Sequence, residues 1–226
     1  MTCGDWGIFL SILGGGIITI ATAIFIEVLR KPKLVLGIEK PELDVPRDSP
    51  QRRHLRLTLR NEPAPFGLQW MLQRAAALQC RGEITFHNLD GQNIFDKTMA
   101  GRWASSPEPI RAAIQTVDSA GNVQTRAVAF ADPDSRIDVY PGEEEKLDVT
   151  VRFAGEQDCY GWNNEAYLNN WRTPDWKLPR GAYLVKAVVT SSGNKCVGEF
   201  RLLNEVDALT AFRLTPLLPE DQRKIR

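Results

Sequence analysis

Residues Tyr183–Leu203 read YLVKAVVTSSGNKCVGEFRLL, and this stretch decides the fold class. Its two ends, Tyr183–Thr190 and Cys196–Leu203, are short runs rich in apolar and β-branched residues. Between them lie two serines, Gly193 and Asn194, which are typical turn residues. Two strand-like runs separated by such a cluster predict a β-hairpin.

The same signals recur along most of the chain. His54–Arg60 alternates, with three leucines predicted to face inward. Lys146–Phe153 alternates in the same way and predicts Leu147, Val149, Val151 and Phe153 on one inward face. Further strands are predicted at Lys33–Glu39, Gln92–Thr98, Ile110–Val117, Val123–Phe130 and Arg136–Tyr140. Short strands separated by Gly, Asn, Asp and Pro turns predict an all-β, antiparallel sandwich.

The longest alternating stretch runs from Phe66 to Phe86. Its apolar residues fall on even positions: Phe66, Leu68, Trp70, Leu72, Ala76, Leu78, Cys80, Ile84 and Phe86. We therefore expect strand here, although residues 68–78 are also compatible with a helical turn. Asn88–Gly91 (NLDG) follows and predicts a hairpin turn.

The N-terminus has a different pattern. Trp6–Ile26 reads WGIFLSILGGGIITIATAIFI and carries no charge. As a helix this run is about 31 Å long, which matches the hydrocarbon core of a bilayer. A cleaved signal peptide would require a basic residue before this run, and no Lys or Arg precedes it. We therefore expect one uncleaved transmembrane helix in front of the sandwich.

Basic residues predict the orientation of this anchor. Arg30, Lys31, Lys33 and Lys40 all follow the apolar run. The positive-inside rule then places the N-terminus outside and the domain in the cytoplasm. Unpaired cysteines are consistent with that compartment: Cys80, Cys159 and Cys196 form no close pair in sequence.

Small side chains recur along one face of the anchor at a spacing of four residues. They are Gly7, Ser11, Gly15, Thr19 and Ala23. Such a ridge lets two membrane helices approach closely. We therefore expect the anchor to associate with another helix, in a homo-oligomer or with a protein partner.

Two strand entries resemble those of immunoglobulin-like modules. One is Pro141-Gly142-Glu143 before KLDVTVRF, and the other is Leu178–Tyr183 before LVKAVVT. The resemblance covers about residues 136–203 and implies an immunoglobulin-like type of sandwich, with a turn glycine and a tyrosine at a corner. It implies no function.

The segment 155–178 is rich in aromatic and amide side chains. As candidate ligand-binding residues it offers Trp162, Asn163, Asn164, Tyr167, Asn169, Trp171 and Trp176. One interpretation is a recognition loop for a glycan, a peptide or a protein, which requires exposed rings. The other is a loop that packs its own aromatics over one end of the sandwich. Asn164 is a candidate cap for a short helix over Glu165–Trp171.

Enzymatic and metal chemistry have little support in the sequence. The two histidines, His54 and His87, lie in no catalytic motif. Asp132, Asp134, Asp138 and Glu143 approach a calcium-loop spacing, but Arg136 and Ile137 break the pattern. We therefore expect no enzyme activity and no cofactor or metal.

The outward arginines of His54–Arg60, with Arg52, are expected to pair with acidic neighbours across strands. Removing residues 1–31 leaves 26 basic and 26 acidic residues, so the domain is neutral. A neutral domain gives no reason to expect nucleic-acid binding.

These observations divide the chain into four parts. They are an anchor at 1–31, a membrane-proximal strand and linker at 32–52, the sandwich at 53–215 and a flexible tail at 216–226. The predicted function is a non-enzymatic binding or scaffolding subunit at the cytoplasmic face of a membrane. The alternative is an extracytoplasmic module that recognises glycan or peptide through residues 155–178.

Overall fold

The computed structural model describes residues 3–40, 43–44, 51–67, 69, 72–130, 136–167, 170–218 and 221. The elements in chain order are α1 (Cys3–Arg30), β1 (Leu34–Ile38), β2 (Leu43–Asp44), β3 (Arg52–Asn61), β4 (Ala77–His87), β5 (Met99–Ala100), β6 (Arg102–Trp103), β7 (Ile110–Val117), β8 (Val123–Phe130), β9 (Ile137–Val139), β10 (Glu144–Phe153), β11 (Cys159–Gly161), η1 (Asn164–Tyr167), η2 (Pro174–Trp176), β12 (Lys177–Leu178), β13 (Gly181–Ser191), β14 (Asn194–Asn204), η3 (Leu209–Ala211) and β15 (Arg213–Pro216). The chain is mostly β-strand, as predicted.

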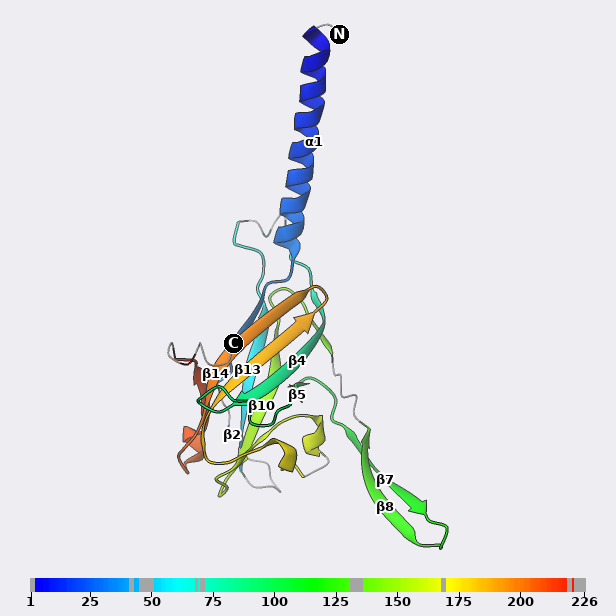
Figure 1. The fold of residues 1–226 in the computed structure, drawn as a ribbon, viewed down its shortest axis with the longest axis vertical. Helices are drawn as coiled ribbons and strands as arrows, with labels where there is room; N and C mark the ends of the chain where they lie inside the picture. The colour runs from blue at the N-terminus through cyan, green and yellow to red at the C-terminus, as the bar shows by residue number, and fades with distance from the viewer. Residues whose placement is uncertain are drawn as a thin grey trace.

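Two antiparallel sheets face one another in a sandwich-like arrangement (Figure 1). The first has the order β1-β3-β10-β11-β12, and β2 and β6 pair with β3 and β10 at its margins. The second has the order β15-β14-β13-β4-β5, and β9 pairs with β4. Because β1 pairs with β3 over five residue pairs, the strand that follows α1 is part of the first sheet.

The main core lies between the sheets and follows the alternation of the strands. Leu55, Leu57 and Leu59 of β3 are buried, as the sequence predicts. They pack in one cluster with apolar residues of the second sheet, including Val185 of β13 and Phe200 of β14. β13 and β14 form the predicted hairpin and occupy the middle of the second sheet.

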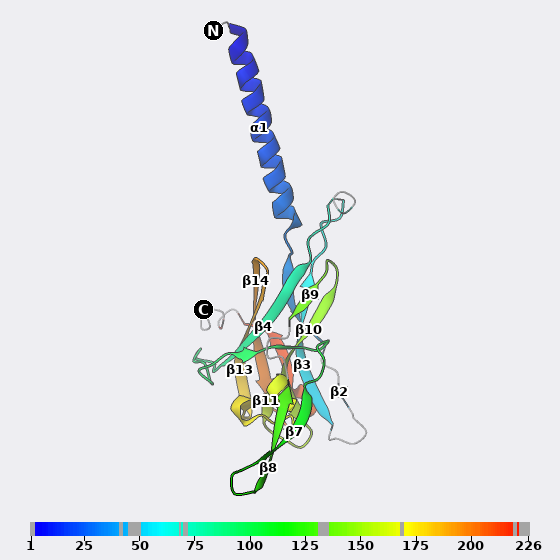
Figure 2. The same ribbon diagram turned by 90° about the vertical axis from the view of Figure 1, so that its right-hand side faces the viewer.

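β7 and β8 have the residue bounds that the sequence predicts, but they lie outside both sheets. They pair with each other from Ile110↔Phe130 to Val117↔Val123 and form a separate two-stranded ribbon. Figures 1 and 2 show this ribbon projecting from the end of the molecule opposite α1. The sequence predicted the two strands correctly and did not predict their separation from the sandwich.

The long strand expected from Phe66 begins only at Ala77. Upstream of Ala77, the described residues form a turn and irregular chain, and Phe66 is 99% exposed instead of facing inward. Pro63 and Pro65 supply no amide proton, and Ala75 N–H donates to Arg30 O at the end of α1 (2.7 Å). The predicted turn at Asn88–Gly91 is confirmed by the Gly91 N–H bond to Asn88 O. The return strand at 92–98 is wrong, because only Asn93 forms a bridge there.

α1 is a continuous helix of 28 residues that extends away from the sandwich (Figures 1 and 2). Three irregular residues, Lys31–Lys33, separate it from β1. Over its described half six apolar side chains are more than half exposed, and Ile26 and Leu29 are partly buried; the six are Ile17, Ile18, Ile20, Ile24, Phe25 and Val28. Among the described residues, no helical segment combines the length and the apolar character needed to cross a membrane. The burial of Gly7, Ser11 and Gly15 is outside what the structure describes, while Thr19 and Ala23 are exposed.

Candidate functional site

A β-bulge in β10 decides what lies on the outer face of the first sheet. The register of β10 on β3 shifts between Asp148 and Thr150. Val151 and Phe153 then pair with His54 and Arg52, on the face opposite the β3 leucines. The expected inward orientation of Val151 and Phe153 is therefore wrong, because one extra residue moves every later side chain to the other face.

The segment 155–178 covers the apolar patch that this bulge creates. Val151 and Phe153 form a second buried cluster with Tyr160, Trp162 and Tyr167, separate from the main core. Within it the indoles of Trp162 and Trp171 stack at 5.0 Å, and the His54 ring meets Trp162 edge-on at 4.7 Å. Burial of aromatic surface of this size makes the segment a structural lid over the sheet.

Few of the candidate ligand-binding side chains are open to a ligand in this arrangement. Trp162, Trp176, Tyr167 and Asn163 are each at most 5% exposed. Trp171 packs partly buried against the second cluster. Trp176 turns instead to the main core, where its ring meets Phe95 at 5.1 Å. Asn169 lies outside the described residues. Exposure of two indoles, which a recognition loop requires, is not found.

The helix over Glu165–Trp171 is shorter than predicted and has a different cap. The structure has a 3-10 turn, η1, at Asn164–Tyr167. Asn163, and not Asn164, accepts the Ala166 N–H at its side-chain oxygen (3.2 Å). Glu165 ties the segment together, because its carboxylate accepts from Asn163 Nδ2 (3.2 Å) and from Trp176 Nε1 (3.1 Å).

A buried carboxylate lies at the bulge between two arginines. Asp148 is 1% exposed and accepts from Arg56 Nε at 2.7 Å and from Arg102 Nη1 at 2.9 Å. The Arg102 guanidinium also lies 5.1 Å from the centre of the Tyr167 ring. Burial raises the pKa of the Asp148 carboxyl, and the two guanidiniums oppose that shift. Asp148 pairs with Arg56 across the strands, and Arg60 pairs with Glu144 in the same way, so the predicted cross-strand pairing is confirmed for these two arginines.

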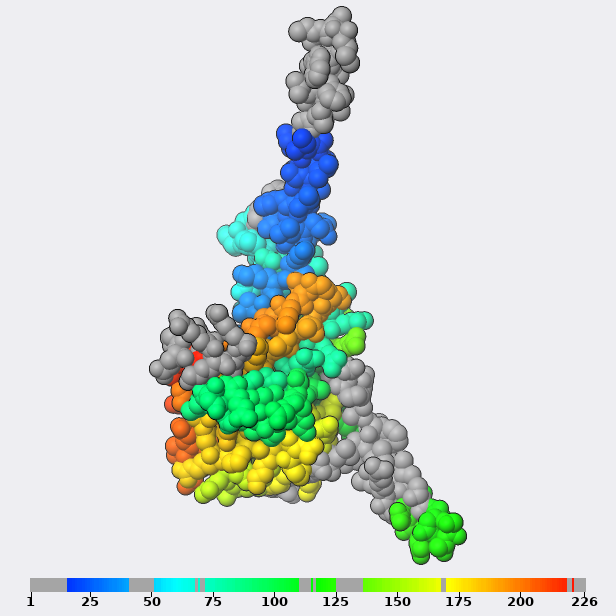
Figure 3. Space-filling model, viewed as in Figure 1, coloured from blue at the N-terminus to red at the C-terminus, as the bar shows by residue number. Residues whose placement is uncertain are grey.

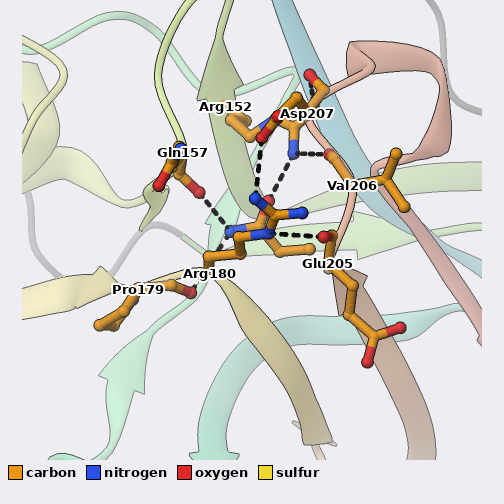
Figure 4. Close-up of polar contacts among 8 residues, drawn as sticks. Arg152, Gln157, Pro179, Arg180, Glu205, Val206 and Asp207 are labelled. Atoms are coloured by element: carbon orange, nitrogen blue, oxygen red, sulfur yellow. Dashed lines mark hydrogen bonds and ion pairs between the residues drawn. The ribbon is translucent and has the colours of Figure 1, made fainter.

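The bulge also turns Arg152 inward, where it joins the loops at one end of the sandwich (Figure 4). Arg152 is 1% exposed, and its Nη1 donates to Asn204 Oδ1 (2.7 Å) and Val206 O (2.8 Å). Its Nη2 donates to Asp207 O (3.0 Å). Asn204 Nδ2 extends the network to Gln157 O (2.8 Å). The sequence analysis missed this network, and the only signal for it was a charged residue within an apolar alternation.

The reactive residue types are used structurally. Burial raises the pKa of the Cys80 thiol to about 11 and also raises that of Cys159. The ring nitrogens of His87 contact Gly91 O (3.0 Å) and Thr85 Oγ1 (2.9 Å). In the part of the chain that the structure describes, no group of three potential metal ligands is present. Asp138 accepts from Gln79 N–H at 2.8 Å, and Asp132 and Asp134 lie outside that part.

One open hollow of about 440 Å³ lies between the segment after β3 and the turn before β10. Its walls include Pro63, Leu72 and Arg74 on one side and Tyr140 and Pro141 on the other.

No protein-family model matches the chain, and neither a curated protein nor a solved structure matches it.

Proposed function

We propose that this protein is a membrane-anchored binding or scaffolding subunit whose sandwich is held at the cytoplasmic face by α1. The observation that carries the proposal is the shape and surface of α1. It projects from the sandwich, and most apolar side chains of its described half are exposed. Its uncharged run, Trp6–Ile26, fits a bilayer core.

Membrane attachment is tested by floating the full-length protein with phosphatidylcholine vesicles after a high-salt wash. The wild-type protein is expected to float. Ile18→Lys places a charge near the centre of the run, at a cost of about 3 kcal/mol, and should reduce the floating fraction. Val197→Lys is the matched control, because Val197 is an exposed apolar residue of the sandwich. Wild-type protein that stays in the soluble fraction would contradict the anchor.

The orientation rests on the exposed basic residues at the end of α1, Arg30, Lys31 and Lys33. A reporter that works only in the cytoplasm should be active when it is fused after Arg226, and a reporter that works only outside the membrane should be inactive there.

The helix-packing ridge is tested separately. Gly15→Leu should weaken self-association in a membrane reporter assay, whereas Ile18→Leu should not. Equal behaviour of the two variants would remove the ridge from the proposal.

The binding role is supported by the β7–β8 ribbon. In the described structure neither strand pairs with any other strand, so the ribbon has two open edges. Open edges are templates for strand addition by a protein partner. Replacing residues 110–130 with a short linker should abolish partner capture from detergent extract and leave the unfolding midpoint of the sandwich unchanged. The same set of captured proteins with and without the ribbon would contradict this role.

We also propose that the sandwich is of the immunoglobulin-like type. Two local features support this. Gly142 has a positive φ of 87° in the turn before β10, and Tyr183 Oη donates to Pro179 O (2.8 Å), as in a tyrosine corner. An experimental structure with a different strand connectivity from that fold would contradict the proposal.

A further inference from the structure

We propose that the loop between β3 and β4, whose described residues are 62–67, 69 and 72–76, is a second membrane contact in which the exposed ring of Phe66 enters the headgroup region beside α1. This inference rests on the proposed anchoring by α1. It goes further, because it assigns a lipid-binding role to the domain itself and fixes which end of the sandwich faces the bilayer.

The loop is tied to the membrane-proximal end of α1 by hydrogen bonds. Ala75 N–H donates to Arg30 O (2.7 Å), and Arg74 Nη1 donates to Lys31 O (3.0 Å). Figures 2 and 3 show the loop, in cyan, beside the last turns of the helix. Arg30 lies four residues beyond the uncharged run, about 6 Å along the helix axis. A distance of about 6 Å matches the thickness of a headgroup layer, so the end of α1 and the start of the loop lie at the outer boundary of that layer.

The described parts of the two legs of the loop are cross-linked by hydrogen bonds. Asn61 Nδ2 donates to Ala75 O (3.0 Å), and Arg74 Nε donates to Pro63 O (3.3 Å). Gln69 Nε2 donates to Ala64 O (2.9 Å) and closes the turn that contains Phe66 and Gly67.

The described apolar side chains of the loop differ in burial. Ala64 and Leu72 are buried, at 5% and 3% exposure. Phe66 contacts almost nothing and is 99% exposed, the highest value among the exposed large apolar residues of the described chain. An aromatic ring held out on a cross-linked turn is well suited to the bilayer interface, where rings of this kind concentrate.

The charges around the loop also fit a contact with lipid headgroups. Arg30 and Lys31 are exposed at the end of α1, next to the loop. Lys33 follows them, although Glu62 of the loop already pairs with it at 2.6 Å. Cations that flank an exposed aromatic match a surface of lipid phosphates with apolar chains beneath.

The test uses full-length protein in vesicles of phosphatidylcholine and phosphatidylglycerol. Phe66→Cys is labelled with an environment-sensitive fluorophore, and quenching by nitroxide-labelled lipids is measured. Val123→Cys is the matched control, because Val123 is also exposed and lies on the ribbon at the opposite end of the molecule. Both variants also carry Cys3→Ser and Cys196→Ser, so that the label reacts only at the introduced cysteine. Cys80 and Cys159 are kept because they are buried.

We expect a blue shift and severalfold stronger lipid quenching at position 66 than at position 123. Protein that floats with vesicles but shows equal quenching at both positions would overturn the loop contact and leave the anchor standing. A blue shift at position 66 without lipid quenching would mean that protein covers the loop, and it would also overturn the inference. Protein that does not float would overturn the anchor and the loop contact together.

Discussion

The hairpins β13–β14 and β7–β8 are alike in backbone pairing and opposite in their surroundings. Both are antiparallel and keep an unbroken register along their whole length. β13 and β14 have further strands on both sides, β4 and β15. β7 and β8 have only each other, and at the far end of their ribbon Val117 and Val123 are 67% and 60% exposed.

This difference shows which part of strand formation is local. Pairing and the turn follow from alternation and turn residues, which both hairpins have. Membership in the sandwich depends on contacts with distant strands, which only one of them has. Because an isolated two-stranded hairpin is marginally stable in water, the ribbon depends on its turn or on a partner, whereas β13–β14 depends on the core.

The comparison is tested most strongly by removing one side chain from each hairpin. Phe200 of β14 is 7% exposed, and its ring lies so close to Gly198 that a Cβ there would be 2.7 Å away. Phe200→Ala should lower the free energy of unfolding by about 3–5 kcal/mol. Val123→Ala in the ribbon should change it by less than about 0.5 kcal/mol. Urea unfolding of both variants measures the difference, and comparable losses would place the ribbon in the cooperative unit.

Arg152 tests how the far end of β14 is held. Arg152→Ala removes the donors to Asn204, Val206 and Asp207 and should cost about 2–3 kcal/mol of unfolding free energy. Arg180→Ala is the control. Arg180 donates to Glu205 O and Asp207 Oδ1 in the same region but is about half exposed, so its loss should cost less than about 1 kcal/mol. Equal costs in the same urea titration would contradict a special role for the buried guanidinium.

Much of the strand layout was predictable because it rests on local alternation. β7 and β8 begin and end at the predicted residues, and the β3 leucines are buried as expected. The bulge at Asp148 was not predictable, because its cause lies in the register against β3 and not in the sequence of β10 alone. That single extra residue explains why Val151 and Phe153 needed the aromatic lid.

The candidate site was harder to predict than the fold. An exposed recognition loop and a buried lid have the same aromatic composition, and only the sheet face beneath decides between them. Phe66 illustrates an error in the other direction. Its place in the alternation of residues 66–86 predicted a buried side chain, and the side chain is exposed. Hydrogen bonds between its loop and α1 override that alternation, and no period in the sequence records such a contact.

High pH should affect the sandwich and spare the ribbon. Burial raises the pKa of Cys80 to about 11 from 9.0 and that of Tyr183 to about 12 from 10.0. The unfolded chain therefore releases these protons first, so their contribution to stability is complete below about pH 9 and is lost as the pH rises toward 11 and above. The urea midpoint should fall over that range. β7–β8 contains no Cys or Tyr, so its NMR shifts should not titrate there.

Cys80→Ala should flatten the lower part of this alkaline decline, because the residue that replaces the thiol does not ionise. Cys196→Ala is the comparison, since Cys196 has a raised pKa but is only partly buried in β14. A decline that is unchanged in Cys80→Ala would assign the pH dependence to the tyrosines and the other thiols, and would contradict the role of Cys80.

The smallest effect on global stability is expected at the turn of the ribbon. Asp118 Oδ1 accepts from the backbone N–H groups of Ala120 and Asn122, each at 2.9 Å, and Oδ2 accepts from Asn122 Nδ2 at 3.0 Å. These bonds lower the pKa of the Asp118 carboxyl, the side-chain bond from Asn122 most of all. The support they give is present above about pH 4 and is lost as the pH falls through the lowered pKa, because the protonated carboxyl is a weaker acceptor. Asp118→Ala should therefore speed amide exchange along β7 and β8 at neutral pH and leave the urea midpoint of the sandwich unchanged. β13–β14 amides in the same sample are the internal control and should keep their protection. If β7–β8 amides instead stay as protected as those of β13–β14 in both proteins, the ribbon is covered by something other than its own turn, and the contrast between the two hairpins fails.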